Sequence, residues 1–193
     1  MSWIELERKL LTYEAKGIEV PTKNLIKTDE QMEGIRKACV LNTAVLDEVE
    51  KNIKVGMSTE DINNIVYDFT TAHGGIPAPL NYEGFPKSVC TSVNDEICHG
   101  IPDKHVILKS GDIVNVDATT ILRGYYGDAS RMFMIGKTTP ARKNLVNITR
   151  ECMRRGIAAA KGWSRVGDIG ATIAAFAHKH GYSVVREFGG HGV

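Results

Sequence analysis

The sequence lacks an excess of either charge and lacks a long hydrophobic run. Its 24 lysines and arginines nearly balance 23 aspartates and glutamates, for a formal net charge of +1, which predicts no bulk attraction to nucleic acid or to an acidic membrane. The first residues mix acids and bases among the apolar Ile4, Leu6 and Leu10, a pattern unlike a signal peptide or a membrane-spanning helix. We therefore expect no nucleic-acid specificity and no membrane attachment.

Cysteine is also scarce. The four cysteines form no CxxC pair and lack the dense spacing of a secreted disulfide framework; they are Cys39, Cys90, Cys98 and Cys152. Reduced thiols are typical of this pattern and favour a cytoplasmic location. With 193 residues, 42% hydrophobic and 24% charged, the chain has the composition of a globular protein with one large domain.

A long helix is predicted near the start of that domain. Residues 1–25 hold a short amphipathic stretch, which we interpret as an N-terminal extension to a domain over residues 26–193. Thr28 and Gln31 have the spacing of a capping box. Apolar residues then recur at helical intervals as far as Gly56, which predicts the first helix of the domain. They are Met32, Ile35, Cys39, Val45, Leu46 and Val49.

The pattern then changes twice. Ser58 opens a second helix that ends near His73, and residues 88–135 read as short β-rich segments divided by turns, which indicates antiparallel sheet. At Thr139 and Pro140 a helical pattern returns, because threonine suits an N-cap and proline the first helical position. The expected buried stripe of this helix is Leu145, Ile148 and Cys152.

The two helical regions resemble each other. Apolar and terminal residues recur 107 positions apart, as Ile62, Val66, Phe69 and His73 and then as Ile169, Ile173, Phe176 and His180. Either the chain contains a duplication, or two amphipathic helices with serine caps look alike by chance. If it is a duplication, the first half runs 62 positions from Gly74 to Gly136, whereas the second has 12 from Gly181 to Val193. The second half would then lack most of its sheet.

Two aspartates dominate the predicted hairpin. Asp117 interrupts a β-branched run, where an isolated carboxylate is costly to bury without a partner. A turn centred between Leu122 and Arg123 would set Asp117 directly opposite Asp128, with Cβ atoms about 5 Å apart. Two divalent ions bridged by carboxylates would compensate both charges. The alternative is that Asp128 is a turn or cap residue and that Asp117 pairs with Arg123 or Arg131.

Two glycine-flanked histidines stand apart from the others. His99 precedes Gly100, and a neutral imidazole there could donate a hydrogen bond to a substrate. His191 lies between glycines after the β-rich residues 183–185, which suits a side chain presented from the end of a strand. Each histidine alone is weak support for a functional site.

Several motifs together resemble one family. They are NYEGFPKSVCTSVNDEICHGIP at residues 81–102, GDIVNVD at 111–117, GD at 127–128 and GHG at 190–192. In this order and spacing they are similar to bacterial-type methionine aminopeptidases, over a region from about Ile26 to the last residue. The resemblance implies an α+β pita-bread (creatinase/aminopeptidase) fold, in which two pseudo-symmetric α/β halves surround a dinuclear metal site.

The resemblance also implies a set of metal ligands. Asp117 would bind one metal ion, Asp128 would bridge both and His191 would bind the other, the two divalent ions being Co, Mn, Fe or Zn. The family needs two further glutamates and a second histidine from a segment that would follow Val193. We therefore expect a C-terminally truncated chain with an incomplete second half, whose own activity is doubtful.

The substrate residues follow from the same resemblance. His99 takes the place of the family histidine that hydrogen-bonds the substrate near the scissile bond and assists catalysis. Tyr82, Phe85 and Cys90 match positions that line the pocket for the N-terminal methionine, and Pro79 occupies another wall position. An apolar, polarizable wall suits a thioether.

The function implied is removal of the initiator methionine from nascent polypeptides with a small second residue, by attack of a metal-bridging hydroxide. Such an enzyme would be a cytoplasmic monomer whose partners are nascent peptides, with ribosome association a further possibility. Two alternatives remain: a noncatalytic pita-bread module that binds peptide ends, and a prolyl-peptide aminopeptidase of the same fold.

Overall fold

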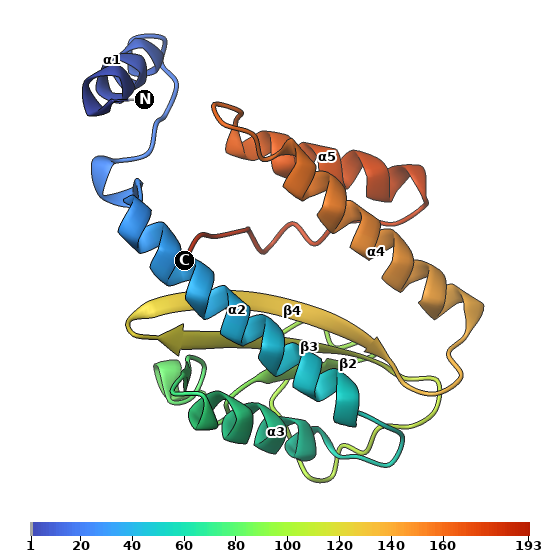
Figure 1. Cartoon of the computed structure of the whole chain (residues 1–193). Helices are drawn as coiled ribbons and strands as arrows, with labels where there is room; N and C mark the ends of the chain where they lie inside the picture. Colours follow the sequence, from blue (N-terminus) through green and yellow to red (C-terminus); the bar gives the residue numbers. More distant parts are fainter. Residues whose placement is uncertain (1) are drawn as a thin grey trace.

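A computed structural model describes residues 2–193. Five α-helices, two short 3-10 helices (η) and four β-strands follow one another along this part of the chain (Figure 1). Their bounds are α1 Trp3–Glu14, η1 Lys23–Leu25, α2 Asp29–Asn52, α3 Thr59–Ala72, β1 Ile76–Pro77, η2 Tyr82–Gly84, β2 Cys90–Val93, β3 Ile113–Leu122, β4 Tyr125–Met134, α4 Pro140–Ala159 and α5 Val166–Lys179.

The helix starts confirm the capping predictions. Thr28 caps α2 through a reciprocal pair: the Gln31 backbone N–H donates to Thr28 Oγ1 at 3.2 Å, and the Thr28 N–H donates to Gln31 Oε1 at 2.8 Å. Thr139 accepts from the backbone of α4, whose first residue is Pro140. Each cap satisfies an N–H group that has no partner within its helix, so these residues fix where the helices begin.

The predicted sheet is antiparallel, and β3 is its central strand. β4 pairs with β3 along its whole length, while β1 and β2 pair with β3 on its other side. Alternate residues of β3 point to opposite faces. Val114, Val116 and Ala118 are buried, whereas Asp117 and Thr119 are half-buried. One face of the sheet therefore belongs to the core, and the other carries polar side chains.

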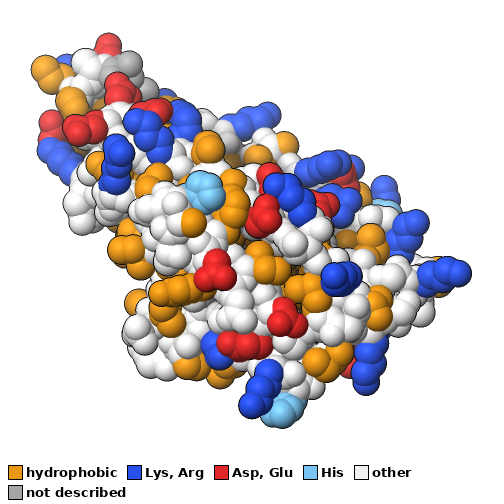
Figure 2. Space-filling view, turned by 60° about the horizontal axis from the view of Figure 1, so that its bottom comes forward, with side chains coloured by type: hydrophobic (Ala, Val, Ile, Leu, Met, Phe, Trp, Pro, Cys, Tyr) orange, Lys and Arg blue, Asp and Glu red, His pale blue; other side chains and the backbone are white. Residues whose placement is uncertain are grey.

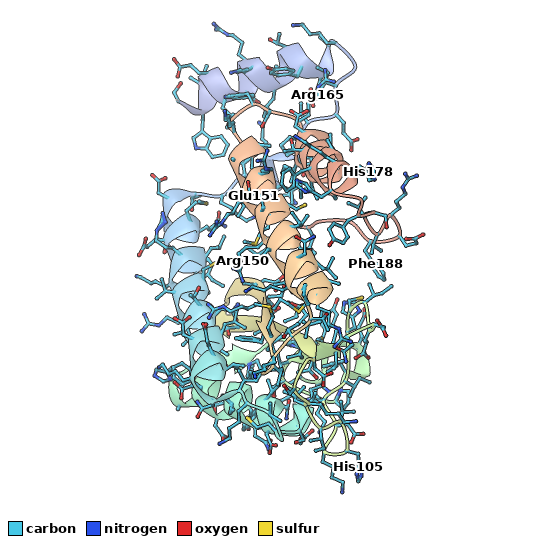
Figure 3. All side chains as sticks on the ribbon, turned by 90° about the vertical axis from the view of Figure 1, so that its right-hand side faces the viewer. His105, Arg150, Glu151, Arg165, His178 and Phe188 are labelled. Carbon is cyan, nitrogen blue, oxygen red and sulfur yellow. The ribbon has the colours of Figure 1, made fainter. Side chains whose placement is uncertain are left out.

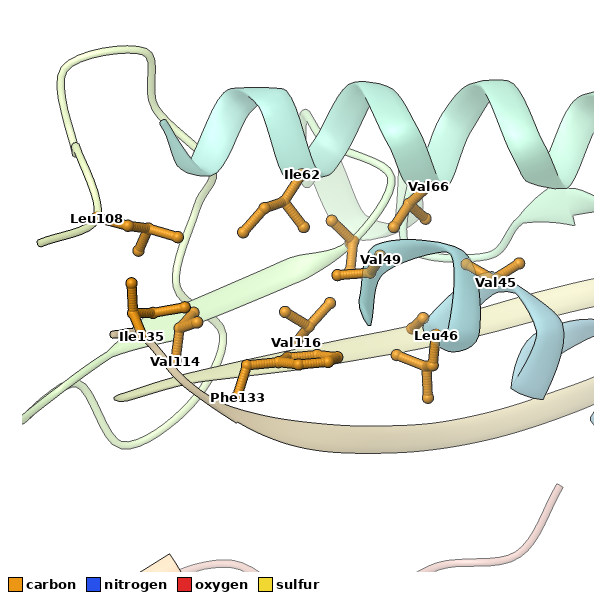
Figure 4. Close-up of a cluster of buried hydrophobic side chains, with 12 residues drawn as sticks. Val45, Leu46, Val49, Ile62, Val66, Leu108, Val114, Val116, Phe133 and Ile135 are labelled. Atoms are coloured by element: carbon orange, nitrogen blue, oxygen red, sulfur yellow. The ribbon is translucent and has the colours of Figure 1, made fainter. Parts of the chain in front are cut away.

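The core lies between the apolar face of the sheet and the helices α2 and α3 (Figure 4). Small residues let α2 approach the hairpin closely. A Cβ atom added at Gly34 would lie 2.4 Å from the Tyr125 ring, and one added at Gly127 would lie 2.5 Å from the Ala38 carbonyl carbon. The buried stripe of α2 therefore includes Ala38, and the apolar Met32, which helical spacing suggested, remains 47% exposed.

The second helix pair repeats the first in detail. α3 and α5 both have 14 residues, and each bound of α5 lies 107 positions after that of α3. His73 and His180 cap their C-termini with a φ of −99° in both cases. Their rings pack on Phe69 and Phe176, with ring centroids 4.1 and 4.5 Å apart. The structure therefore favours duplication over chance similarity.

The packing of the second pair differs from that expected. α4 and α5 pack against each other where Gly156 meets Ile173, and the buried residues of α4 are Val146, Cys152 and Gly156. Leu145 is 38% exposed, so the predicted stripe was partly wrong, because a close crossing with α5 selects the buried face. In the described chain after α5, residues 183–185 also form no strand.

The N-terminal helix α1 contacts the loop between α4 and α5. The Tyr13 ring stacks on that of Trp163 with centroids 5.8 Å apart, and Lys9 Nζ lies 3.6 Å from the Trp163 ring centroid. Figure 3 shows Arg165, the N-cap of α5, next to α1 and His105 at the opposite end of the molecule.

The surface reflects the balanced composition of the chain. Acidic and basic side chains are interspersed among hydrophobic ones on the face shown in Figure 2. The four cysteines are free thiols. Over residues 2–193, none of the helices combines the length and the hydropathy that crossing a bilayer requires.

Candidate metal and substrate site

The two aspartates lie on the same face of the hairpin but not directly opposite each other. Asp117 faces Ser130, and Asp128 faces Thr119. The predicted register was wrong because the chain reverses at Arg123 and Gly124, which both have positive φ values of 52° and 85°, as a two-residue hairpin turn requires. The turn is thus centred one residue later, and the carboxylates become diagonal neighbours, about 7 Å apart at their backbones.

In the part of the chain that the structure describes, no lysine or arginine compensates Asp117. Arg131, the alternative partner, extends from β4 to α2, where it pairs with Asp47 at 2.9 Å and with Glu50 at 2.6 Å. Within residues 2–193, neither aspartate has a lysine or arginine within ion-pair distance. The structure therefore contradicts the arrangement in which arginine neutralises Asp117.

His191 comes to this face from the segment after α5. Its Nε2 atom lies 3.7 Å from Asp128 Oδ2, and its Nδ1 atom lies 3.0 Å from the Gly192 carbonyl oxygen. The histidine was expected at the end of a strand, but the described residues after α5 form no strand. The imidazole side chain is 73% exposed. The chain thus brings an imidazole from beyond α5 to a carboxylate of β4.

Burial and like charge act together on Asp117. Burial raises the pKa of this carboxyl above its ordinary value, and the neighbouring charge of Asp128 raises it further, while His99 and His191 oppose the rise. A carboxylate that is hard to ionise beside a second carboxylate favours a nearby cation. Two oxygen donors and one imidazole suit a divalent ion of intermediate hardness, so the residues present fit the metal that the sequence implies.

The donor set is not complete in itself. Over residues 2–193, no three side chains of His, Cys, Asp or Glu come together closely enough to hold a metal ion. Asp117, Asp128 and His191 share one face, but they are a partial set. They can supply some of the ligands of a metal centre, and further ligands would have to complete it.

Cys90 is a direct neighbour of this pair. It lies opposite Asp117 across β2 and β3 and is buried. Burial, followed by the charge of Asp117, raises the pKa of the Cys90 thiol to about 11. The thiol therefore stays protonated at neutral pH, which makes it a poor metal ligand or nucleophile and a suitable apolar wall.

His99 is held in a turn beside β2. The Thr91 backbone N–H donates to the Gly100 carbonyl oxygen at 2.8 Å, and the Gly100 N–H donates to Ser92 Oγ at 3.2 Å. His99 itself has a φ of +56°, a left-handed conformation that is uncommon for residues other than glycine. Its exposed ring meets Phe188 edge to face, with centroids 6.3 Å apart. The turn presents the imidazole to solvent.

The remaining predicted pocket residues lie in and beside η2. The Asn81 backbone N–H donates to the Phe85 carbonyl oxygen at 2.8 Å, which closes a tight loop before β2. Phe85 is half-buried, but the Tyr82 side chain is 67% exposed. A cleft of about 650 Å³ lies elsewhere, between α2 and the β3–β4 turn, and contains none of the predicted site residues.

Sequence reasoning missed one residue of this face, Thr119. Its Oγ1 donates a hydrogen bond to Asp128 Oδ1 at 2.8 Å. The available signal was its position two residues after Asp117 in a strand, which puts both side chains on the same face. The error in the hairpin register concealed the pairing with Asp128.

Comparisons with known proteins identify the family of the chain. Residues 33–193 match metallopeptidase family M24. The chain is 48% identical over 163 residues to methionine aminopeptidase A of Synechocystis, an alignment that covers 84% of this chain and 64% of the relative. The chain thus spans 64% of the length of this relative and of the methionine aminopeptidase of Rickettsia prowazekii, and 50% of the human mitochondrial methionine aminopeptidase 1D.

Solved structures show the same likeness. The crystal structure of methionine aminopeptidase from Rickettsia prowazekii is 45% identical with a TM-score of 0.84, over 87% of this chain and 67% of that one. The enzyme from Thermotoga maritima is 36% identical with a TM-score of 0.85, over 87% and 68%. The fold is the α+β pita-bread fold, and the chain belongs to metallopeptidase family M24 and, within it, to the methionine aminopeptidases.

Proposed function

We propose that this chain is part of a metalloaminopeptidase that releases the N-terminal methionine of new polypeptides whose second residue is small. The observation that supports the proposal most directly is a pair of carboxylates on one sheet face, Asp117 and Asp128, with His191 3.7 Å from the second. Within residues 2–193 neither carboxylate has a lysine or arginine partner. The curated relatives are named methionine aminopeptidases. Because the chain spans only 42–64% of the length of these and other relatives, the activity is proposed for the whole protein.

Each of these residues has a proposed role at the metal. Asp117 would hold one divalent ion, Asp128 would contact both and His191 would hold the other. When bound, the ions would supply Lewis-acid activation of the scissile carbonyl and of water. Two ions drawn from Co, Mn, Fe or Zn are proposed, because carboxylate and imidazole donors accept all four.

The substrate residues are proposed to act around this centre. His99, projecting from its turn, would donate a hydrogen bond to the peptide near the scissile bond. Cys90 would form an apolar wall for the methionine side chain, since its thiol is protonated and buried. Tyr82 and Phe85 would extend that wall.

Other features of the proposal concern the setting of the enzyme. We propose a monomer that acts in the cytoplasm on nascent peptides, in association with ribosomes, and a domain over residues 26–193 preceded by an extension over residues 1–25. The free cysteines support the cytoplasm, because it is a reducing compartment in which thiols stay unpaired. A noncatalytic peptide-binding module is the second candidate, because no three donors converge in the described chain.

The test is the release of methionine from the peptide Met-Ala-Ser by the purified whole protein, of which this chain is part, with Mn²⁺ or Co²⁺. We expect metal-dependent release that Asp128→Ala abolishes, since this residue is proposed to contact both ions. Ser130→Ala is the matched control, because Ser130 lies on the same face opposite Asp117. Metal binding without release of methionine would favour the binding module, and preferential cleavage of X-Pro peptides would favour a prolyl-peptide aminopeptidase.

A further inference from the structure

Thr119 has none of the roles proposed above, although it lies within the site. It is directly opposite Asp128 in the hairpin, and its half-buried side chain shares the face of both aspartates. Its hydroxyl donates to Asp128 Oδ1 at 2.8 Å. In the described chain, this is the one hydrogen bond from a side chain to the carboxylate of either aspartate.

This hydrogen bond determines how the Asp128 carboxylate is turned. Oδ1 accepts from Thr119, while Oδ2 lies 3.7 Å from His191 Nε2. The terminal torsion of an aspartate is otherwise soft, with broad minima. The hydroxyl therefore holds the carboxylate so that Oδ2 faces the imidazole. It occupies one lone pair of Oδ1 and leaves the lone pairs of Oδ2 available.

The backbone of Thr119 is fixed from the opposite side of the strand. Its carbonyl oxygen accepts a hydrogen bond from the Ala78 N–H at 2.8 Å, and the next residue, Thr120, pairs with Pro77 of β1. Ala78 precedes Pro79, a position expected in the methionine pocket. Thr119 thus links the segment that leads into the pocket with the carboxylate proposed to bridge the metals.

We propose that Thr119 is a positioning residue that orients the Asp128 carboxylate and thereby sets the metal affinity of the site. The inference rests on the proposed metal role of Asp128. Hydrogen-bond partners of metal ligands typically change metal affinity by about 10–100-fold when they are removed. The β-branched side chain of Thr119 also suits a strand, so a purely structural role must be separated from the positioning role.

Two substitutions separate these roles. Thr119→Val keeps the shape and the strand propensity but removes the hydroxyl, whereas Thr119→Ser keeps the hydroxyl and removes the methyl group. Ser130→Ala is the control on the same face: it lies opposite Asp117, is exposed, and has no hydrogen bond from its hydroxyl in the described chain.

The measurement is calorimetric titration of Mn²⁺ into the 193-residue chain, with urea unfolding of each variant in parallel. We expect the dissociation constant to rise about 10–100-fold in Thr119→Val, and to stay within about threefold of the parent in Thr119→Ser and Ser130→Ala, a change of less than 1 kcal/mol. Unfolding midpoints should stay close to that of the parent, because Val preserves the strand.

Several outcomes would overturn the proposal. They are Mn²⁺ binding by Thr119→Val equal to that of the parent, equal weakening by Thr119→Ser or Ser130→Ala, and absence of Mn²⁺ binding by the parent chain. The proposed function is tested separately by the release of methionine. A protein that binds Mn²⁺ in a Thr119-dependent way but releases no methionine would reject the proposed peptidase and retain the role of Thr119.

Discussion

The two helix pairs of this molecule have nearly the same local design and very different burial. α3 and α5 share their length and the histidine at their C-cap, 107 positions apart. Ile62 in α3 is fully buried, whereas its equivalent Ile169 in α5 is half-buried. The first pair covers the sheet and the second packs on itself (Figure 1). Local sequence therefore determines where the helices begin and end, and the element that each helix packs against determines how much it stabilises the fold.

The largest expected effect of this difference is at the equivalent isoleucines. Ile62→Ala should lower the free energy of unfolding by about 2–5 kcal/mol, because it opens a cavity in the core. Ile169→Ala should cost about 1 kcal/mol, since the side chain is already partly in contact with water. Urea unfolding followed by circular dichroism measures both. Equal losses would show that α5 is as well packed as α3, against the burial observed here.

A smaller effect, with opposite signs in the two regions, is expected at two glycines. Gly127→Ala places a Cβ atom 2.5 Å from the Ala38 backbone, and the resulting overpacking should cost about 1–3 kcal/mol. Gly170 lies within α5 with no atom near its added Cβ. Gly170→Ala should stabilise by up to about 1 kcal/mol through helix propensity. Thermal unfolding distinguishes the two signs, and destabilisation by Gly170→Ala would reveal contacts on the open face of α5.

The sequence predicted the elements better than it predicted their faces. Thr28 and Thr139 located two helix starts because capping is a local hydrogen-bond pattern. The buried face of α2 was partly missed, since it depends on the approach of Gly127 to Ala38, residues far apart in the chain. Periodicity cannot show which distant residue is small enough to admit a helix.

The same limit applies to the candidate site. The sequence indicated that Asp117 and Asp128 share a face, and the structure agrees. The residue opposite Asp117 is Ser130, however, two residues beyond the predicted partner Asp128. The turn depends on the conformation of Arg123, a non-glycine residue at a φ of +52°, which residue preference does not reveal. Thr119 was missed for this reason. His191 reaches the site through the chain path after α5, which no local pattern specifies.

The site face can also be compared with the core face of the same strand. Val116 and Ala118 stabilise the fold by burial, whereas burial of Asp117 between them raises its pKa and opposes ionisation. When folding raises the pKa of a carboxyl, the folded protein loses stability as the pH rises through that raised pKa. Asp117→Asn, measured without metal and with a chelator, should therefore increase the free energy of unfolding at pH 7 and have little effect below the ordinary pKa of 3.8.

The same substitution should have the opposite effect once metal is present. Mn²⁺ that binds the folded chain raises its stability by mass action, and Asn removes the charge proposed to bind it. Addition of Mn²⁺ should thus raise the urea midpoint of the parent more than that of Asp117→Asn. Equal stability of the two proteins at pH 7 without metal would show that Asp117 has a compensating partner. If instead the Asp117→Asn variant is more stable without metal and its urea midpoint does not respond to Mn²⁺, then Asp117 destabilises the metal-free chain because its charge is needed to bind the ion.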